Sequence, residues 1–241
     1  MSSNPGANAI STADSSLWIV FGDLHDQIGN IKKIPQLEQA AGIIISGDLT
    51  QLGGVAEAEK VISEASRSNL PVLAQTGNMD KPEIDSWLSK KGINIHARAV
   101  EITPGVAIFG IGGSTPTPFN TPTEYPENSY AAWLDKCWQT ASKYSGKILI
   151  SHNPPKDTNC DKIGSGSHVG SQAVRDFIEK YQPNLCICGH IHESRGEDQI
   201  GKTIIINPGM LSAGGYAIIK IDKGKISSYL CKVDNPESRG I

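Results

Sequence analysis

The chain has little of what marks a membrane, secreted or general nucleic-acid-binding protein. Its 241 residues have a formal net charge of −3 and no cluster of lysine or arginine, so a broad basic surface is not expected. No apolar stretch approaches the roughly 20 residues of a membrane-spanning helix. The first residues also lack the basic start and apolar middle of a signal peptide.

The two ends of the chain are polar and poor in large apolar residues. We expect residues 1–16 to form a disordered leader and residues 235–241 a frayed tail. Residues 17–234 are predicted to form one domain, because α/β folds of this length are routinely single domains.

Cysteine is also scarce, with five residues: Cys137, Cys160, Cys186, Cys188 and Cys231. An odd number without a secretion signal is typical of reduced thiols in a cytoplasmic protein. Cys186 and Cys188 form a C-x-C pair that could bind a metal or act in redox chemistry. We interpret them instead as two small buried residues, because positions i and i+2 of a strand share one face.

Five short apolar runs are each bounded by turn residues, which is typical of strands buried on both faces of a sheet. The runs cover residues 17–21, 42–46, 71–76, 147–150 and 184–188. Helical segments are expected at residues 30–40, 55–68, 80–90, 127–144 and 171–181. This alternation predicts an α/β fold with parallel strands. Further β-rich segments, joined by short turns, are expected at residues 93–102, 106–111, 203–206, 216–221 and 226–233, with a hairpin turn at 222–225.

A short polar cluster follows each of the five apolar runs. The clusters are Asp23-Leu24-His25, Gly47-Asp48, Gly77-Asn78, Ser151-His152 and Gly189-His190-Ile191-His192. Together they offer two carboxylates, one carboxamide and four imidazoles. This set of donors suits divalent metals of borderline softness. Because it contains no thiolate, it favours Mn, Fe, Zn, Co or Ni, and the sequence does not distinguish among these metals.

The order of the clusters resembles that of the calcineurin-like metallophosphoesterase superfamily, whose pattern is D-x-H, G-D, G-N-H-D/E, a lone His and then G-H-x-H. The resemblance runs from about Trp18 to Gly209. It implies the metallo-dependent phosphatase fold, a four-layer αββα sandwich in which helices flank two mixed β-sheets. It also implies hydrolysis of a phosphomonoester or phosphodiester by a metal-activated hydroxide.

The resemblance further implies two divalent metal ions per chain, about 3.5–4 Å apart, with one carboxylate between them. Transferred position by position, the bridging residue is Asp48. The pattern assigns Asp23, His25 and His192 to one ion and Asn78, His152 and His190 to the other. Asp48 and Asn78 are then also the catalytic residues, and Asn78 is expected to contact the substrate.

The third cluster departs from the family pattern. Residues 77–80 read GNMD, with Met79 at the position where many members have histidine. In those members the histidine is thought to help protonate the leaving group, which a thioether cannot do. The resemblance therefore supports metal binding more strongly than it supports efficient catalysis.

Three residues beside the clusters each have two interpretations. His168 lies in a glycine-rich loop at residues 164–170 and is either the general acid that the third cluster lacks or an ordinary hydrogen-bonding residue. Arg195 is either a substrate-binding clamp on a phosphate oxygen or a solvated side chain. We interpret Asp80 as the N-cap of the following helix, with Glu83 completing a capping box, rather than as a catalytic residue.

Two other classes of function stay open beside the hydrolase. A non-catalytic protein-binding scaffold on the same fold is one, although a scaffold has no chemical need for seven ligands. A nuclease is another, but it predicts a basic surface that the net charge does not indicate. We expect a small phosphorylated substrate, with neither a membrane nor nucleic acid as a partner. The sequence leaves the substrate's identity and the oligomeric state open.

Overall fold

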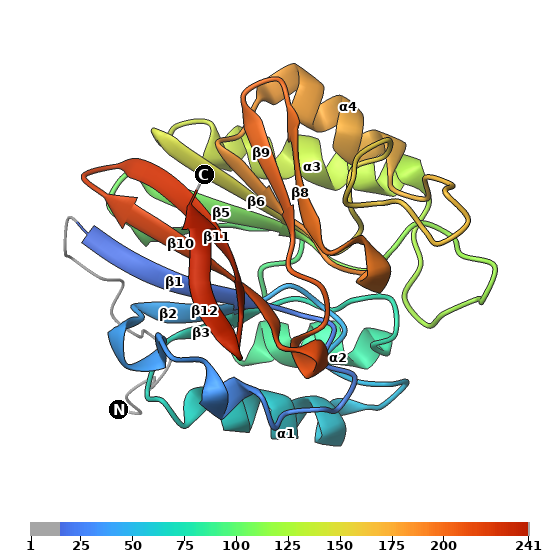
Figure 1. Ribbon diagram of the computed structural model, residues 1–241. Coiled ribbons are helices and arrows are strands. Elements are labelled where there is room, and N and C mark those ends of the chain that lie inside the picture. Colours follow the sequence, from blue (N-terminus) through green and yellow to red (C-terminus); the bar gives the residue numbers. More distant parts are fainter. Residues whose placement is uncertain (1–14, 241) are drawn as a thin grey trace, which may run out of the picture.

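The computed structural model describes residues 15–240, and side chains as far as residue 235. The strands form two six-stranded sheets, and both sheets are mixed (Figure 1). The first has the strand order β12 (Asn235–Gly240), β11 (Lys225–Lys232), β10 (Gly215–Asp222), β1 (Ser15–Phe21), β2 (Gly42–Ile45) and β3 (Val72–Ala74). The second has the order β4 (Ala99–Thr103), β5 (Val106–Ile111), β6 (Gly146–Ser151), β7 (Leu185–Ile187), β9 (Thr203–Asn207) and β8 (Gly196–Ile200). The α-helices are α1 (Val55–Ser66), α2 (Pro82–Lys90), α3 (Glu127–Ala141) and α4 (Gln172–Tyr181).

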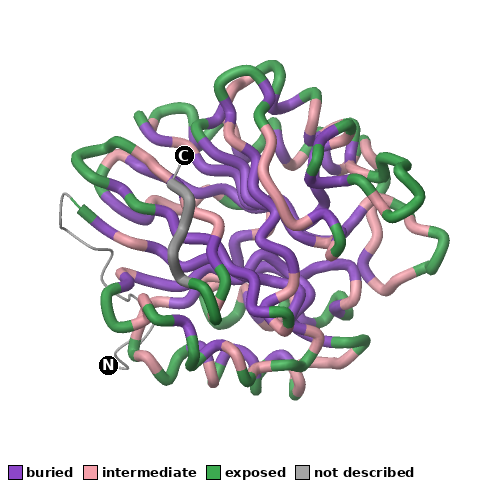
Figure 2. Tube along the Cα trace, in the orientation of Figure 1, coloured by how far each residue is buried: buried purple, intermediate pink, exposed green. Residues whose placement is uncertain are grey.

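Three apolar cores separate four layers. Val61 of α1 and Ile84 of α2 belong to a core against the first sheet. Ile44 and Ile150 belong to a second core between the two sheets, and Leu134 of α3 belongs to a third against the second sheet. Figure 2 shows the buried chain running through the middle of this stack, with exposed segments at its periphery. The four-layer αββα sandwich implied by the family resemblance is confirmed.

Strand β1 shows how the sequence produces this layering. Successive side chains of a strand point to opposite faces of the sheet. Ile19 and Phe21 lie in the core under the helices, whereas Trp18 and Val20 lie between the sheets. A continuous apolar run is therefore required here, because both faces of the sheet are covered.

The predicted hairpin turn is confirmed. Asp222 of β10 and Lys225 of β11 are the last paired residues of the hairpin. Lys223 and Gly224 between them form a two-residue loop. Both have positive φ angles, 50° and 78°, as the preferred two-residue hairpin turn requires. Among the helices of the described chain, none has the length and apolar character needed to cross a membrane.

The prediction of a helix at residues 30–40 is wrong. Two 3₁₀ turns, η1 (Ile31–Lys33) and η2 (Leu37–Gln39), occupy this segment. Pro35 lies between them, and proline lacks the N–H that a continuous helix needs. The apolar residues still reach the core, since Ile31 and Ile34 are both about 2% exposed.

The structure also corrects both expected ends of the domain. Residues 235–240, expected as a frayed tail, form β12 and pair antiparallel with β11. At the other end, Ser15 and Ser16 already belong to β1 and pair with β10. The rest of the expected leader, residues 1–14, lies outside the described residues.

Candidate metal centre

The candidate ligands follow the carboxyl ends of parallel strands from both sheets. Asp23 comes after β1, Asp48 after β2, Asn78 after β3, His152 after β6, and His190 and His192 after β7. β1, β2 and β3 run parallel, and so do β5, β6, β7 and β9. The carboxyl ends of an open parallel sheet are the usual position of a site, and here two such edges face each other.

Four of these side chains converge on one point. Suitable atoms of Asp23, His25, Asp48 and His192 all lie within 4.8 Å of one another. The Nε2 atoms of His25 and His192 are 3.2 Å apart, and His192 Nε2 is 3.3 Å from Asp23 Oδ1. Ligand atoms around a tetrahedral ion with bonds of about 2.1 Å are about 3.4 Å from one another. The spacing of this cluster therefore fits a divalent cation.

Asp48 connects this cluster to a second group of side chains. Its Oδ2 atom lies 3.7 Å from His25 Nε2 on one side and 3.4 Å from His152 Nε2 on the other. His152 Nε2 is also 3.1 Å from the carboxamide oxygen of Asn78. The His190 ring lies beside that of His152, with 5.4 Å between the ring centroids. The other six residues predicted as ligands are thus arranged around the Asp48 carboxylate.

The backbone of the site is strained. Asp23, His25, Asp48 and His190 have φ angles of 49°, 45°, 49° and 68°, in the left-handed region that few residues other than glycine adopt. Such strain costs of order 1–3 kcal/mol per residue and concentrates at functional sites. The surrounding fold therefore holds these side chains in place against local preference.

Two glycines of the clusters make room for the carboxylates. A Cβ atom on Gly77 would overlap the side chain of Asp48, and one on Gly189 would lie 2.6 Å from Asp23 Oδ2. The backbone N–H of His190 also donates to Asp23 at 3.2 Å. Glycine is thus required before Asn78 and His190 because another candidate ligand packs against its backbone.

Asp80 is not the helix cap that the sequence suggested. The N-cap of α2 is Lys81, with no side-chain cap bond, whereas the Asp80 carboxylate is buried and accepts hydrogen bonds from the N–H groups of Leu49, Thr50 and Gly77. It therefore fixes the two loops that carry Asp48 and Asn78. Local spacing gave the wrong partner because two of the three donors, Leu49 and Thr50, come from about 30 positions away in the chain.

Gln75 and Asn207 are further supporting residues, and of these two the sequence analysis missed Gln75. The Gln75 amide donates to the carbonyls of Ser46, Ile111 and Ile150, at the ends of strands from both sheets. The Asn207 amide donates to the carbonyl of Ile191 at 2.9 Å, inside the His190–His192 segment. The polar turn beginning at Asn207 was the one available signal in the sequence.

The charges of the site are strongly coupled. Burial raises the pKa of Asp23, but hydrogen bonding with His192 and nearby imidazoles lower it to about 2. Burial lowers the pKa of His152, but the Asp48 carboxylate outweighs this and raises it to about 9. Burial and the neighbouring His152 lower the pKa of His190 to about 4. Without a metal, the site thus holds a proton on His152 and keeps His190 neutral.

His168 and Arg195 lie outside this arrangement. The Nδ1 atom of His168 is 2.6 Å from Oδ1 of Asp161, a buried carboxylate that also accepts from the N–H of Gly170. The Arg195 guanidinium donates to the carbonyl of Cys231 in β11 at 3.0 Å. Within the described part of the chain, neither side chain forms a hydrogen bond or an ion pair with the seven candidate ligands.

The two sheets flanked by helices form the metallo-dependent phosphatase fold. The chain matches a sequence model of the family described as metallophosphoesterase, calcineurin superfamily, over residues 55–229. This chain therefore belongs to the calcineurin metallophosphoesterase superfamily.

Two relatives match over most of the chain. An uncharacterised protein of Methanocaldococcus jannaschii is 38% identical over 170 residues, which cover 69% of this chain and 76% of the relative. A Caenorhabditis elegans protein of the group UPF0046 is 26% identical over 212 residues, which cover 81% of this chain and 70% of the relative.

Solved structures share the fold at low sequence identity. A dimetal phosphatase from Danio rerio is similar with a TM-score of 0.69 and 12% identity, covering 94% of this chain and 98% of that one. Plasmodium GAP50, described as the anchor in the inner membrane complex, is similar with a TM-score of 0.67 and 14% identity. The match covers 94% of this chain and 88% of the Plasmodium chain. At such identities these likenesses show the fold alone.

Proposed function

We propose that this protein hydrolyses a phosphomonoester or phosphodiester with two divalent metal ions. The observation that supports this best is the position of the Asp48 carboxylate, whose Oδ2 atom lies between His25 Nε2 at 3.7 Å and His152 Nε2 at 3.4 Å. A dinuclear site needs one carboxylate in that position. Asp23, His25 and His192 would hold one ion, and Asn78, His152 and His190 the other.

The chemistry of the donors suits Mn, Fe, Zn, Co or Ni. When bound, two such ions would supply positive charge to the phosphate and lower the pKa of a water molecule for an in-line attack. The protein's own part is to supply neutral imidazoles and fixed oxygens. His190 meets this need with its low pKa, because burial and His152 keep it uncharged. Asn78 is oriented by its amide, which donates to the Thr121 hydroxyl at 3.1 Å.

We also propose that His168 is the general acid that protonates the leaving group. Its Nδ1 atom is engaged by Asp161, so Nε2 is the ring nitrogen left to face a substrate. The next residue, Val169, lines a cavity beside the metal centre. The sequence analysis offered Arg195 as a residue that binds a phosphate oxygen. Its guanidinium instead donates a hydrogen bond to the carbonyl of Cys231.

A cytoplasmic location is also proposed. All five cysteines are buried and free, and burial raises the pKa values of Cys137, Cys186 and Cys188. Buried thiols of this kind are typical of reducing compartments.

The test is metal content and hydrolysis of p-nitrophenyl phosphate and bis(p-nitrophenyl) phosphate by chelator-stripped protein, with and without added Mn²⁺. We expect two ions per chain, and turnover only after reloading. Asp48→Ala should lose both ions and lower turnover by at least about a hundredfold. Asp222→Ala, which changes an exposed carboxylate at a hairpin end, is the control and should behave as wild type.

The same experiment separates the alternatives. Absence of both metal binding and turnover would favour the scaffold interpretation. Metal binding without turnover on either ester would instead indicate that Met79 limits catalysis, because a thioether cannot protonate the leaving group. Retention of two tightly bound ions by Asp48→Ala would show that the ligand assignment is wrong.

A further inference from the structure

We propose that the cavity beside the candidate metal centre binds an uncharged, apolar alcohol portion of the phosphoester substrate. This inference rests on the proposed function, because it places the phosphate at the metal centre and the rest of the substrate in the cavity. It assigns the class of substrate, which neither the fold nor the family determines.

The cavity has a volume of about 870 Å³ and begins at two candidate ligands, Asn78 and His190. Cavities of roughly 300–1,000 Å³ accommodate small organic ligands. The rest of its lining comes from Met79 and from four further segments of the chain: Leu52, residues 115–121, Ile163 with Gly164 and Val169, and Ile191 with Glu193. A phosphoester held at the metal centre would therefore direct its alcohol portion into this space.

The large exposed apolar side chains of the described residues gather at this cavity. Among the side chains that the structure describes, Leu52, Phe119 and Val169 are the large hydrophobic residues classed as exposed, at 50%, 81% and 38%. All three line the cavity, and each comes from a different loop. A concentration of exposed apolar residues at one place marks a binding site rather than random surface composition.

Leu52 is held there at an energetic cost. Its φ angle is 61°, in the left-handed region where a bulky side chain is a true outlier. Strain of this kind persists where the surrounding structure imposes it, and it clusters at ligand clamps. The conformation keeps a large apolar side chain at the mouth of the cavity.

The loop that carries Phe119 is organised by a carboxylate. Glu124 Oε1 accepts hydrogen bonds from the hydroxyls of Thr117 and Thr121, each at 2.6 Å, and from the N–H of Thr121 at 2.8 Å. Thr117 Oγ1 in turn accepts from the N–H of Phe119 at 3.1 Å. The threonine hydroxyls are thus engaged with Glu124, which leaves apolar carbon as the main surface offered to a ligand.

The charge of the lining excludes a second anionic group. Glu193 is its one charged residue, and neither lysine nor arginine is present among the residues that line it. A polyphosphate, a nucleic acid strand or another anion in this space would meet a carboxylate and no cation. The favoured occupant is therefore neutral and apolar, such as an aryl or alkyl group.

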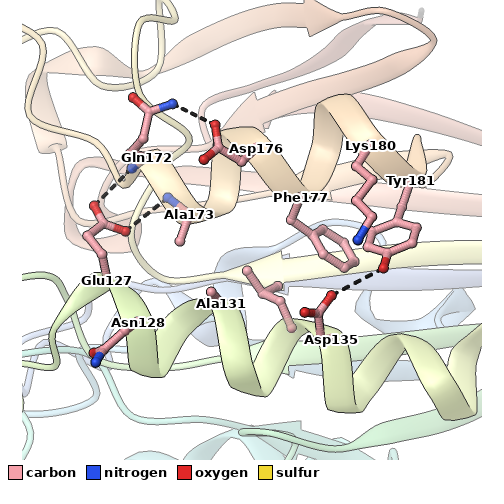
Figure 3. Close-up of a pocket in the computed structure, with 11 residues that line it drawn as sticks. Glu127, Asn128, Ala131, Asp135, Gln172, Ala173, Asp176, Phe177, Lys180 and Tyr181 are labelled. Atoms are coloured by element: carbon pink, nitrogen blue, oxygen red, sulfur yellow. Dashed lines mark hydrogen bonds between the residues drawn. The ribbon is translucent and has the colours of Figure 1, made fainter.

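A second cavity, between α3 and α4, shows the contrast. It measures about 370 Å³ and is lined by charged groups that include Glu127, Asp135, Asp176 and Lys180 (Figure 3). These groups are partly used within the protein: Glu127 accepts from the first N–H groups of α4, and Asp135 accepts from the hydroxyl of Tyr181. Among the residues that the structure describes, no cluster of candidate metal ligands lies beside this second cavity.

The test is calorimetric binding of three non-hydrolysable probes to the Mn²⁺-loaded protein: inorganic phosphate, methylphosphonate and 1-naphthylphosphonate. We expect the naphthyl probe to bind at least about tenfold more tightly than the methyl probe, because it buries more apolar surface. In the double variant Leu52→Ser/Phe119→Ser this ratio should fall to near one, with unchanged affinity for phosphate and for Mn²⁺. Phe119→Leu is the matched control and should keep most of the preference.

Each other outcome overturns the inference in a distinguishable way. Equal affinity of the methyl and naphthyl probes, with phosphate still bound, would remove the apolar subsite and leave the proposed function intact. Failure of all three probes to bind would overturn the proposed function and the inference with it. If neutral phosphatidylcholine vesicles bind wild type but not the double variant, and the naphthyl preference is absent, the apolar rim contacts a membrane surface instead.

Discussion

The candidate metal centre and the cavity beside it are built in opposite ways. The centre is polar and largely buried, and it lies at the carboxyl ends of strands from two sheets, where Asp23 and Asp48 are each 1% exposed. The cavity rim is apolar and exposed, and it lies on loops, with Phe119 81% exposed. Precise chemistry needs a rigid scaffold, whereas substrate choice can be carried by loops that change without disturbing it.

We expect the largest effect of a single substitution on metal affinity at a glycine of the candidate metal centre. Gly77→Ala would place a Cβ atom against the Asp48 side chain and should lower Mn²⁺ affinity by about 10–100-fold, as loss of a supporting contact does at metal sites. Gly29→Ala is the matched control, because a Cβ atom there meets nothing within 4 Å. Equal metal affinity of the two variants would contradict the close approach.

Acid should weaken metal binding at the centre, because ions and protons compete for the same imidazoles. Burial lowers the pKa of His152, but Asp48 and Asp23 raise it to about 9, so the metal-free imidazole is protonated below that pH. Affinity for Mn²⁺ should therefore rise about tenfold per pH unit up to about pH 9 and then level off.

Calorimetry in buffers of different ionisation enthalpy measures the protons that Mn²⁺ displaces. At pH 7 at least about one proton should be released per chain. No release at that pH would show that Asp48 does not hold His152 in its charged form. The phosphonate preference of the cavity should not depend on this proton.

The hydrogen bonds that the Asp80 carboxylate accepts should contribute to the free energy of unfolding. Asp80→Asn replaces a buried acceptor of three backbone N–H groups with a side chain that also donates, and it should lower the free energy of unfolding by about 1–3 kcal/mol. Glu83→Gln should change it by less than about 0.5 kcal/mol, since Glu83 is exposed. Urea denaturation measures both, and the reverse order would restore the helix-cap interpretation.

The smallest effect on stability is expected at the rim. Phe119→Ser should change the free energy of unfolding by less than about 0.5 kcal/mol, because the side chain makes few contacts to lose. Phe109→Ala, at a fully buried phenylalanine of the third core, should cost about 3–5 kcal/mol. A large loss at Phe119 would mean that the rim is part of the core rather than a binding surface.

Much of the fold could be predicted from the sequence, because its strands are buried on both faces and so appear as continuous apolar runs. The segment at residues 30–40 could not, since its apolar spacing is helical while Pro35 breaks the helix into two short turns. β8 was also missed. Its residues Glu197, Asp198 and Gln199 lack an apolar pattern, and pairing with β9 at the sheet edge makes the strand.

The sequence by itself determined the order of the candidate ligands and their place in the fold, because each follows an apolar strand whose end places it at the edge of a sheet. Tertiary structure alone decided what holds them: Asp80, Gln75 and Asn207 bond to backbone groups of segments distant in the chain. It also decided the character of the cavity, which three separate loops create by bringing Leu52, Phe119 and Val169 together. Hydrogen bonds and apolar contacts between remote segments leave no spacing in a sequence, and so only the folded chain shows them.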